Sequence, residues 1–182
     1  VSWARRCVKE TVAAGTTGES PTLTHDEEVE LFKFVKEKTA GRCKLIFGAG
    51  SNCTQTAVMA TKNAKDAGAD AILSVVPYYN KPSQKGLLEH FGTIANSTDL
   101  PVILYNIPGR TGITMKPETI GELAKRHKNI VAVKQSLADM DVITETRRAC
   151  PDDFLIYSGD DSLTLPMMSV GAYGVILSLI HI

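Results

Sequence analysis

The chain has 182 residues, 43% of them hydrophobic and 22% charged, which is typical of a globular domain large enough to bury a sizeable core. Its 20 basic residues balance its 20 acidic residues, and neither sign gathers in a long block, so we expect no nucleic-acid partner and no membrane surface. No apolar stretch approaches the length of a membrane span.

Short apolar runs rich in β-branched residues alternate with stretches of helical periodicity along the chain. Such runs favour strands that are buried on both faces, as in a parallel sheet covered by helices. Seven runs have this character: residues 11–14, 44–47, 71–76, 101–105, 130–133, 154–157 and 174–177.

Each gap between two of these runs carries a helical pattern. The first gap has the spacing of a capping box from Thr24 to Glu27 and a stop at Gly41, and the fourth begins near Pro117. We expect the apolar residues at helical spacing to face the core. In the last gap these residues are Leu163, Leu165, Met168 and Val170.

Repeated strand–helix–strand units predict a parallel sheet with right-handed crossovers. A barrel of eight such units needs about 250 residues, so seven strands here indicate an α/β (β/α)8 TIM barrel that is incomplete. The open doubly wound sheet is the alternative. It usually carries a G-x-G-x-x-G fingerprint, whereas Gly48-Ala49-Gly50 is followed here by Ser51-Asn52-Cys53.

Lys134 follows the apolar run Ile130-Val131-Ala132-Val133 directly. A poorly hydrated ammonium at the end of a buried strand has a lowered pKa, and a neutral lysine can form a Schiff base with a carbonyl substrate. The alternative is a lysine that simply closes the strand and extends into water.

Polar residues follow the other strands at the barrel end where chemistry takes place. Hydroxyls lie between glycines at residues 15–20, phenols follow at residues 77–80, and Tyr105 precedes a Pro-Gly turn and Arg110. The sixth strand ends in residues 158–161, Ser-Gly-Asp-Asp. Singly these are compatible with a turn, packed aromatics, a surface ion pair and a helix cap. Together they describe a site for a small keto acid, with a carboxylate cradle, a proton-shuttling phenol and an amine nucleophile.

The cysteines and histidines are scattered along the sequence. Their spacing favours reduced thiols in a cytoplasmic protein over a disulfide set, and it predicts no metal site. They are Cys7, Cys43, Cys53, Cys150, His25, His90, His127 and His181.

Five motifs in this order resemble the dihydrodipicolinate synthase (4-hydroxy-tetrahydrodipicolinate synthase) family over roughly residues 12–176: Gly15-Thr16-Thr17-Gly18-Glu19, Tyr78-Tyr79-Asn80, the segment Tyr105–Gly112, Lys134, and Ser158-Gly159-Asp160-Asp161. The resemblance implies a lyase of lysine and diaminopimelate biosynthesis that condenses pyruvate with aspartate semialdehyde, without a metal or an organic cofactor. It also implies a cytoplasmic homo-oligomer, usually a dimer of dimers.

The resemblance further implies a role for each matching catalytic residue. Lys134 matches the Schiff-base lysine, Tyr105 the phenol that moves protons, and Thr16 the hydroxyl of its proton relay. Tyr79 matches the relay tyrosine that reaches into the site of a neighbouring subunit.

Further matches concern substrate binding. Thr17 matches a contact to the pyruvate carboxylate, Arg110 the arginine that holds the semialdehyde carboxylate, and Gly159 and Ile176 backbone positions lining the pocket. Arg110 favours the synthase over N-acetylneuraminate lyases and 2-keto-3-deoxy-sugar-acid aldolases, which share the lysine and the tyrosine and remain the alternative.

The sequence departs from the family at two places. Gln135-Ser136 stands where the family usually has Glu-Ala, which we expect to alter the support of Lys134 rather than the reaction. Glu28 and Thr56 differ from the enterobacterial pattern of the lysine-feedback pocket. Its other positions match at Ser20, His25, Asn52 and Tyr78, a possible allosteric lysine site.

The ends also differ, because the family has a further βα unit before residue 11 and a helical region after the eighth strand. We therefore expect residues 1–182 to be a single fragmentary barrel domain, with residues 177–182 as a possible non-native tail. An incomplete barrel leaves two unpaired edges, so an inactive fragment or a non-catalytic scaffold is the alternative of another class.

Overall fold

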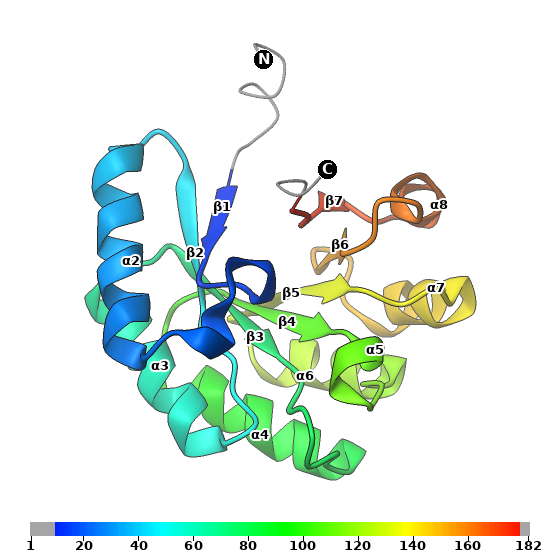
Figure 1. The fold of residues 1–182 in the computed structure, drawn as a ribbon. Helices are drawn as coiled ribbons and strands as arrows, with labels where there is room; N and C mark the ends of the chain where they lie inside the picture. The colour runs from blue at the N-terminus through cyan, green and yellow to red at the C-terminus, as the bar shows by residue number, and fades with distance from the viewer. Residues whose placement is uncertain (1–9, 179–182) are drawn as a thin grey trace.

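The computed structural model describes residues 10–178 and shows a curved sheet with helices on its outer side (Figure 1). Residues 1–9 and 179–182, which include Cys7, His181 and most of the expected non-native tail, lie outside the described residues. Over the described part, seven strands form one sheet in the order β1 to β7, and every neighbouring pair is parallel. The predicted α/β fold and all seven predicted strands are confirmed.

The elements follow one another along the chain in alternation. The strands are β1 (Glu10–Ala13), β2 (Lys44–Gly48), β3 (Ala71–Val75), β4 (Val102–Asn106), β5 (Ile130–Gln135), β6 (Leu155–Ser158) and β7 (Gly174–Val175). The α-helices are α2 (His25–Thr39), α3 (Thr54–Asp66), α4 (Gln84–Asn96), α5 (Pro108–Thr111), α6 (Pro117–Arg126), α7 (Met140–Ala149) and α8 (Thr164–Ser169). Two short 3-10 helices, η1 (Thr16–Gly18) and η2 (Ser20–Thr22), join β1 to α2.

Local sequence signals set the helix boundaries. At the start of α2 the backbone N–H of Glu27 donates to Thr24 Oγ1 at 3.3 Å, and the N–H of Thr24 donates to Glu27 Oε2 at 2.8 Å, so the predicted capping box is present. The helix ends before Gly41, whose φ of 73° suits glycine. Pro117 occupies the first turn of α6, as predicted.

Two apolar layers hold the sheet in place. The layer between the sheet and the helices contains fully buried side chains such as Phe32, Leu87 and Ile120, each worth about 1.5–3 kcal/mol of burial. The inner face of the sheet carries a smaller cluster that includes Ile103 and Tyr105. Because side chains alternate along a strand, the inner cluster marks the face that lines the interior of a barrel.

The two sheet edges are open, as expected, but the expectation for the last helix is wrong. β1 and β7 are its two edges, and they do not pair with each other within residues 10–178. The sequence pattern placed Leu165 and Met168 of α8 in the core, but they are 78% and 51% exposed. Only Met167 of this helix is fully buried, because α8 lies beside the last described strand and no further described element covers its other face.

Over the same residues, no helix is both long enough and apolar enough to cross a membrane.

Candidate active site

Three polar side chains lie side by side across the inner face of the sheet. In the strand register Tyr105 of β4 is opposite Lys134 of β5, and Lys134 is opposite Tyr157 of β6. Residues in register on neighbouring parallel strands project to the same side, and Tyr105 and Tyr157 both belong to the inner cluster. In the sheet Lys134 therefore has a tyrosine on each neighbouring strand.

Lys134 is half-buried in this row. Its Nζ lies 4.1 Å from the centroid of the Tyr105 ring, and burial lowers its pKa from 10.5 to about 8. Contact with the ring face favours the charged amine, but loss of hydration is the larger effect. At pH 7.5 about a quarter of the amine is then neutral, against roughly one part in a thousand for an ordinary lysine.

Tyr105 is buried, and burial raises the pKa of its phenol. Two neighbours oppose this effect: the hydroxyl of Ser136 and the positive charge of Arg110 both favour the ionised form. Arg110 itself is exposed on the short helix α5, close enough for its charge to act on the phenol. The phenol stays protonated at neutral pH and can act as a general acid.

Gly159 and Ile176 follow the neighbouring strands β6 and β7. The N–H of Gly159 donates to the carbonyl of Gln135 at 2.8 Å, and the N–H of Ile176 donates to that of Ser158 at 2.9 Å. A Cβ atom on Gly159 would lie 1.9 Å from Ser136 Oγ and 2.8 Å from Lys134 Cε, so any larger residue here would require the Ser136 and Lys134 side chains to shift. Both residues lie at the same end of the sheet as Lys134.

Thr16 and Thr17 lie in η1, directly after β1. The Thr16 side chain is exposed, and no hydrogen bond within residues 10–178 joins it to Tyr105. The side chain of Thr17 lies outside the described part of the structure. No contact among the described residues therefore joins Thr16 to Tyr105, as the predicted proton relay would require.

Tyr79 points away from the chain that carries it. Its side chain is 90% exposed, and its φ of 72° is a left-handed conformation that costs a tyrosine roughly 1 kcal/mol or more. The loop is tied to the start of α3, because Asn52 Nδ2 donates to Tyr78 O at 3.3 Å and Asn80 Nδ2 donates to Asn52 O at 3.0 Å. Tyr79 is thus presented outward rather than brought to Tyr105.

Ser20 and His25 meet at the first turn of α2, around Glu28. The Ser20 hydroxyl donates to Glu28 Oε1 at 2.5 Å, and His25 Nδ1 lies 3.2 Å from Glu28 Oε2. Glu28 is only 7% exposed, whereas His25 is exposed. Sequence reasoning treated Glu28 as a departure, although its spacing of three residues from His25 was a signal that the two meet. No hydrogen bond among the described residues joins this group to Asn52 and Tyr78.

A network of buried side-chain amides, which the sequence did not predict, holds the strand that carries Lys134. Asn106 Nδ2 donates to Gln135 Oε1 at 2.9 Å, and Gln135 Nε2 donates to Thr146 Oγ1 at 3.3 Å. Asn106 also exchanges two hydrogen bonds with the backbone of Met115, at 3.0 and 3.1 Å. These bonds tie β4, β5 and α7 together and fix the strand positions of Tyr105 and Lys134.

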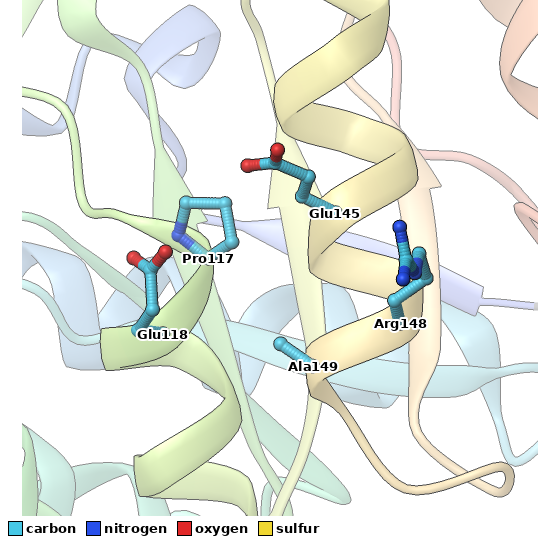
Figure 2. A pocket seen from close by; sticks show the side chains of 5 residues that line it. All are labelled: Pro117, Glu118, Glu145, Arg148 and Ala149. Atoms are coloured by element: carbon cyan, nitrogen blue, oxygen red, sulfur yellow. The ribbon is translucent and has the colours of Figure 1, made fainter.

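A separate groove lies in the helix layer between α6 and α7 (Figure 2). Its volume is about 350 Å³, and Pro117, Glu118, Glu145, Arg148 and Ala149 line it. The groove does not include the inward-facing row of Lys134. In the described part of the chain, no cluster of three or more His, Cys, Asp or Glu side chains is placed to hold a metal ion.

The chain is similar to known proteins over nearly its whole length. A family model described as the dihydrodipicolinate synthetase family matches residues 6–182. The 4-hydroxy-tetrahydrodipicolinate synthase of Desulforamulus reducens is 53% identical over 171 residues, which are 94% of this chain and 58% of that protein. For the Bacillus subtilis enzyme of the same name the identity is 50%, over 94% of this chain and 59% of the relative.

Solved structures agree with this result. A dihydrodipicolinate synthase from Cyanidioschyzon merolae with lysine bound has a TM-score of 0.90 and 53% identity, over 92% of this chain and 57% of that one. The dihydrodipicolinate synthase of Aquifex aeolicus has a TM-score of 0.92 and 48% identity, over 96% and 60% of the two chains. The present chain thus spans less than two thirds of the length of these relatives.

Proposed function

Because the chain belongs to the dihydrodipicolinate synthetase family, we propose that it carries the Schiff-base site of a 4-hydroxy-tetrahydrodipicolinate synthase, with pyruvate and aspartate semialdehyde as substrates. The observation that carries this proposal is the position of Lys134, with its Nζ on the ring of Tyr105 and its pKa lowered by burial to about 8. A neutral, oriented amine is what attack on a ketone requires.

The chemistry follows from the two residues in contact. The neutral Nζ of Lys134 attacks the keto carbon of pyruvate to give a carbinolamine. Tyr105 donates its proton to the carbinolamine oxygen, which leaves as water, so that a C=N bond replaces the C=O bond. The phenolate then takes a proton from the methyl group. The resulting enamine carbon adds to the aldehyde carbon of the second substrate as its C=O π bond opens, Tyr105 returns the proton to the alkoxide oxygen, and hydrolysis of the C=N bond frees the amine of Lys134.

Charged and backbone groups around the lysine suit the two carboxylates. We propose that Arg110 holds the carboxylate of the semialdehyde as a bidentate partner, and that Thr17 contacts that of pyruvate. Gly159 and Ile176 line the pocket. The alternative substrates are N-acetylneuraminate and 2-keto-3-deoxy-sugar acids, and they should be assayed in parallel with aspartate semialdehyde. Turnover of one of these sugar acids, without turnover of aspartate semialdehyde, would replace the proposed substrate.

The outward position of Tyr79 supports a proposal about assembly. A tyrosine that is 90% exposed on a strained loop is available to a second copy of the chain, as expected for a relay residue that completes the neighbouring site. We propose a homodimer at least, and a dimer of dimers for the complete protein. We also propose a cytoplasmic location, with Cys43, Cys53 and Cys150 as free thiols.

We further propose an allosteric lysine site formed by Ser20, His25, Asn52 and Tyr78. Glu28 supports it, because a buried carboxylate that already accepts from Ser20 and contacts His25 is a suitable partner for a lysine ammonium. Lysine binding measured by calorimetry should weaken at least tenfold in Glu28→Gln. Equal affinity in both proteins would remove Glu28 from the site.

Sodium borohydride trapping tests the catalytic proposal. Reduction in the presence of pyruvate should leave an N-carboxyethyl group on Lys134, detected by peptide mass spectrometry. The adduct should be lost in Lys134→Ala and kept in Lys128→Ala, which removes an exposed lysine just before β5. An unmodified Lys134 in the wild-type protein would contradict the proposal.

A further inference from the structure

Ser136 lies two residues after Lys134 and on the same side of the chain. Its backbone N–H donates to the carbonyl of Asn106 at 2.9 Å, and its hydroxyl donates to the carbonyl of Gly159 at 3.3 Å. The residue is therefore held between the ends of β4 and β6, the strands that flank Lys134.

The space beside Gly159 brings Ser136 and Lys134 together. The position of a Cβ on Gly159 lies 1.9 Å from Ser136 Oγ and 2.8 Å from Lys134 Cε, so these two atoms are within about 5 Å of each other. Lys134 Nζ in turn lies 4.1 Å from the centre of the Tyr105 ring. The serine hydroxyl thus lies close to the Lys134 side chain, whose amine in turn lies over the Tyr105 ring.

A buried phenol that loses its proton needs a hydrogen-bond donor, because an unpaired charge out of water is costly. The Ser136 hydroxyl favours the ionised form of Tyr105, against the effect of burial. The Thr16 hydroxyl, expected for this purpose, is exposed and makes no hydrogen bond to Tyr105 in the described part of the chain. A serine hydroxyl can either donate or accept, and its hydrogen rotates to suit the partner that is available.

We propose that Ser136 is a positioning residue for proton transfer by Tyr105. While the phenol is protonated, the serine hydroxyl donates to the Gly159 carbonyl. When Tyr105 gives its proton to the departing carbinolamine oxygen, the hydroxyl turns and donates to the phenolate. It returns to Gly159 when the phenolate takes the methyl proton. The catalytic part of this inference rests on the proposed function, whereas the hydrogen bond to the phenolate does not.

Ultraviolet titration of tyrosinate tests the hydrogen bond without any substrate. The difference between the wild-type and Tyr105→Phe titrations isolates the phenol of Tyr105. In Ser136→Ala, measured against its own Tyr105→Phe partner, this phenol should titrate about one pH unit higher, the value of one modest hydrogen bond to a charged group. Ser136→Thr keeps the hydroxyl and should titrate as the wild type. Equal titration in Ser136→Ala and the wild type would overturn the inference.

The pH dependence of pyruvate trapping separates this inference from the proposed function. Ser136→Ala should trap pyruvate up to about tenfold more slowly, with the alkaline limb of its profile moved up by about one unit, and Ser136→Thr should restore both. Adducts with superimposable profiles in all three proteins would refute the role of Ser136 and leave that of Lys134 intact. An absence of adduct in all three would refute the proposed function, and the titration then decides on Ser136. If Ser136→Ala does not fold, Ser136→Cys replaces it, since a thiol is a poor donor of similar size.

Discussion

The contact of Gly159 with the side chain of Lys134 yields a sharp prediction. In Gly159→Ala the added methyl group would lie 1.9 Å from Ser136 Oγ and 2.8 Å from Lys134 Cε, both well inside van der Waals contact. The serine hydroxyl can rotate away, but the lysine side chain must then also shift from its position on the Tyr105 ring. Overpacking of this kind costs about 1–3 kcal/mol, and a displaced nucleophile loses its orientation.

We therefore expect Gly159→Ala to lower the initial rate of pyruvate trapping at least tenfold and to reduce the free energy of unfolding by about 1–3 kcal/mol. The rate is measured by borohydride trapping and mass spectrometry, and the stability by urea unfolding. Gly109→Ala is the matched control, because a Cβ on Gly109 of α5 meets no atom within 4 Å. A Gly159→Ala protein that traps pyruvate at the wild-type rate would refute the reasoning about the space around Lys134.

Three further predictions concern Lys134, Gln135 and His90. Because burial lowers the pKa of Lys134 to about 8, the rate at which Lys134 traps pyruvate should rise about tenfold per pH unit below pH 8 and level off near pH 8. A rate that continues to rise towards pH 10.5 would show that the pKa of Lys134 is that of an exposed lysine. Gln135→Glu should lower the free energy of unfolding in urea by at least about 2 kcal/mol at neutral pH, because Thr146 already donates its proton to a backbone carbonyl and cannot donate to the new carboxylate. The control Gln55→Glu, at an exposed position, should leave the free energy of unfolding nearly unchanged. Equal losses of stability in the two variants would contradict the buried network. His90 has its pKa lowered by burial from 6.5 to about 4, so the unfolded chain binds the proton first as the pH falls through this window, and stability should drop by about 2 kcal/mol between pH 7 and pH 5. His90→Gln should remove that part of the pH dependence, and an unchanged dependence would show that other groups cause it.

The repeated strands were predictable because short apolar runs recur at regular intervals, and the central strands β3 and β4 are buried almost throughout. Seven such runs became β1 to β7, with ends that differ by a residue or two; β5 continues through Gln135, so Lys134 lies inside a strand rather than after it. Periodicity failed at Leu165 and Met168, which have the spacing of a core-facing helix but are exposed. A hydrophobic pattern identifies the apolar face of a helix, but it does not show whether another element covers that face.

The site was predictable in part, because the carboxyl ends of parallel strands meet. That rule brings Lys134 and Tyr105 together, and the register confirms that they are neighbours. Tyr157 was missed, since only the register of β6 against β5 shows that it faces the lysine. Gln135 was read as a departure from a family pattern, and its partners Asn106 and Thr146 could not be found without the packing of α7 on the sheet. The roles of Thr16, Thr17 and Tyr79 remain predictions.

The central claim is that Lys134 is a nucleophile towards pyruvate, and its most direct test is the mass of the peptide that contains it after reduction. With pyruvate and borohydride this peptide should gain one N-carboxyethyl group, while the peptide that carries Lys128 stays unmodified. Modification of exposed lysines at the same rate as Lys134, or no modification of Lys134 at all, would contradict the account.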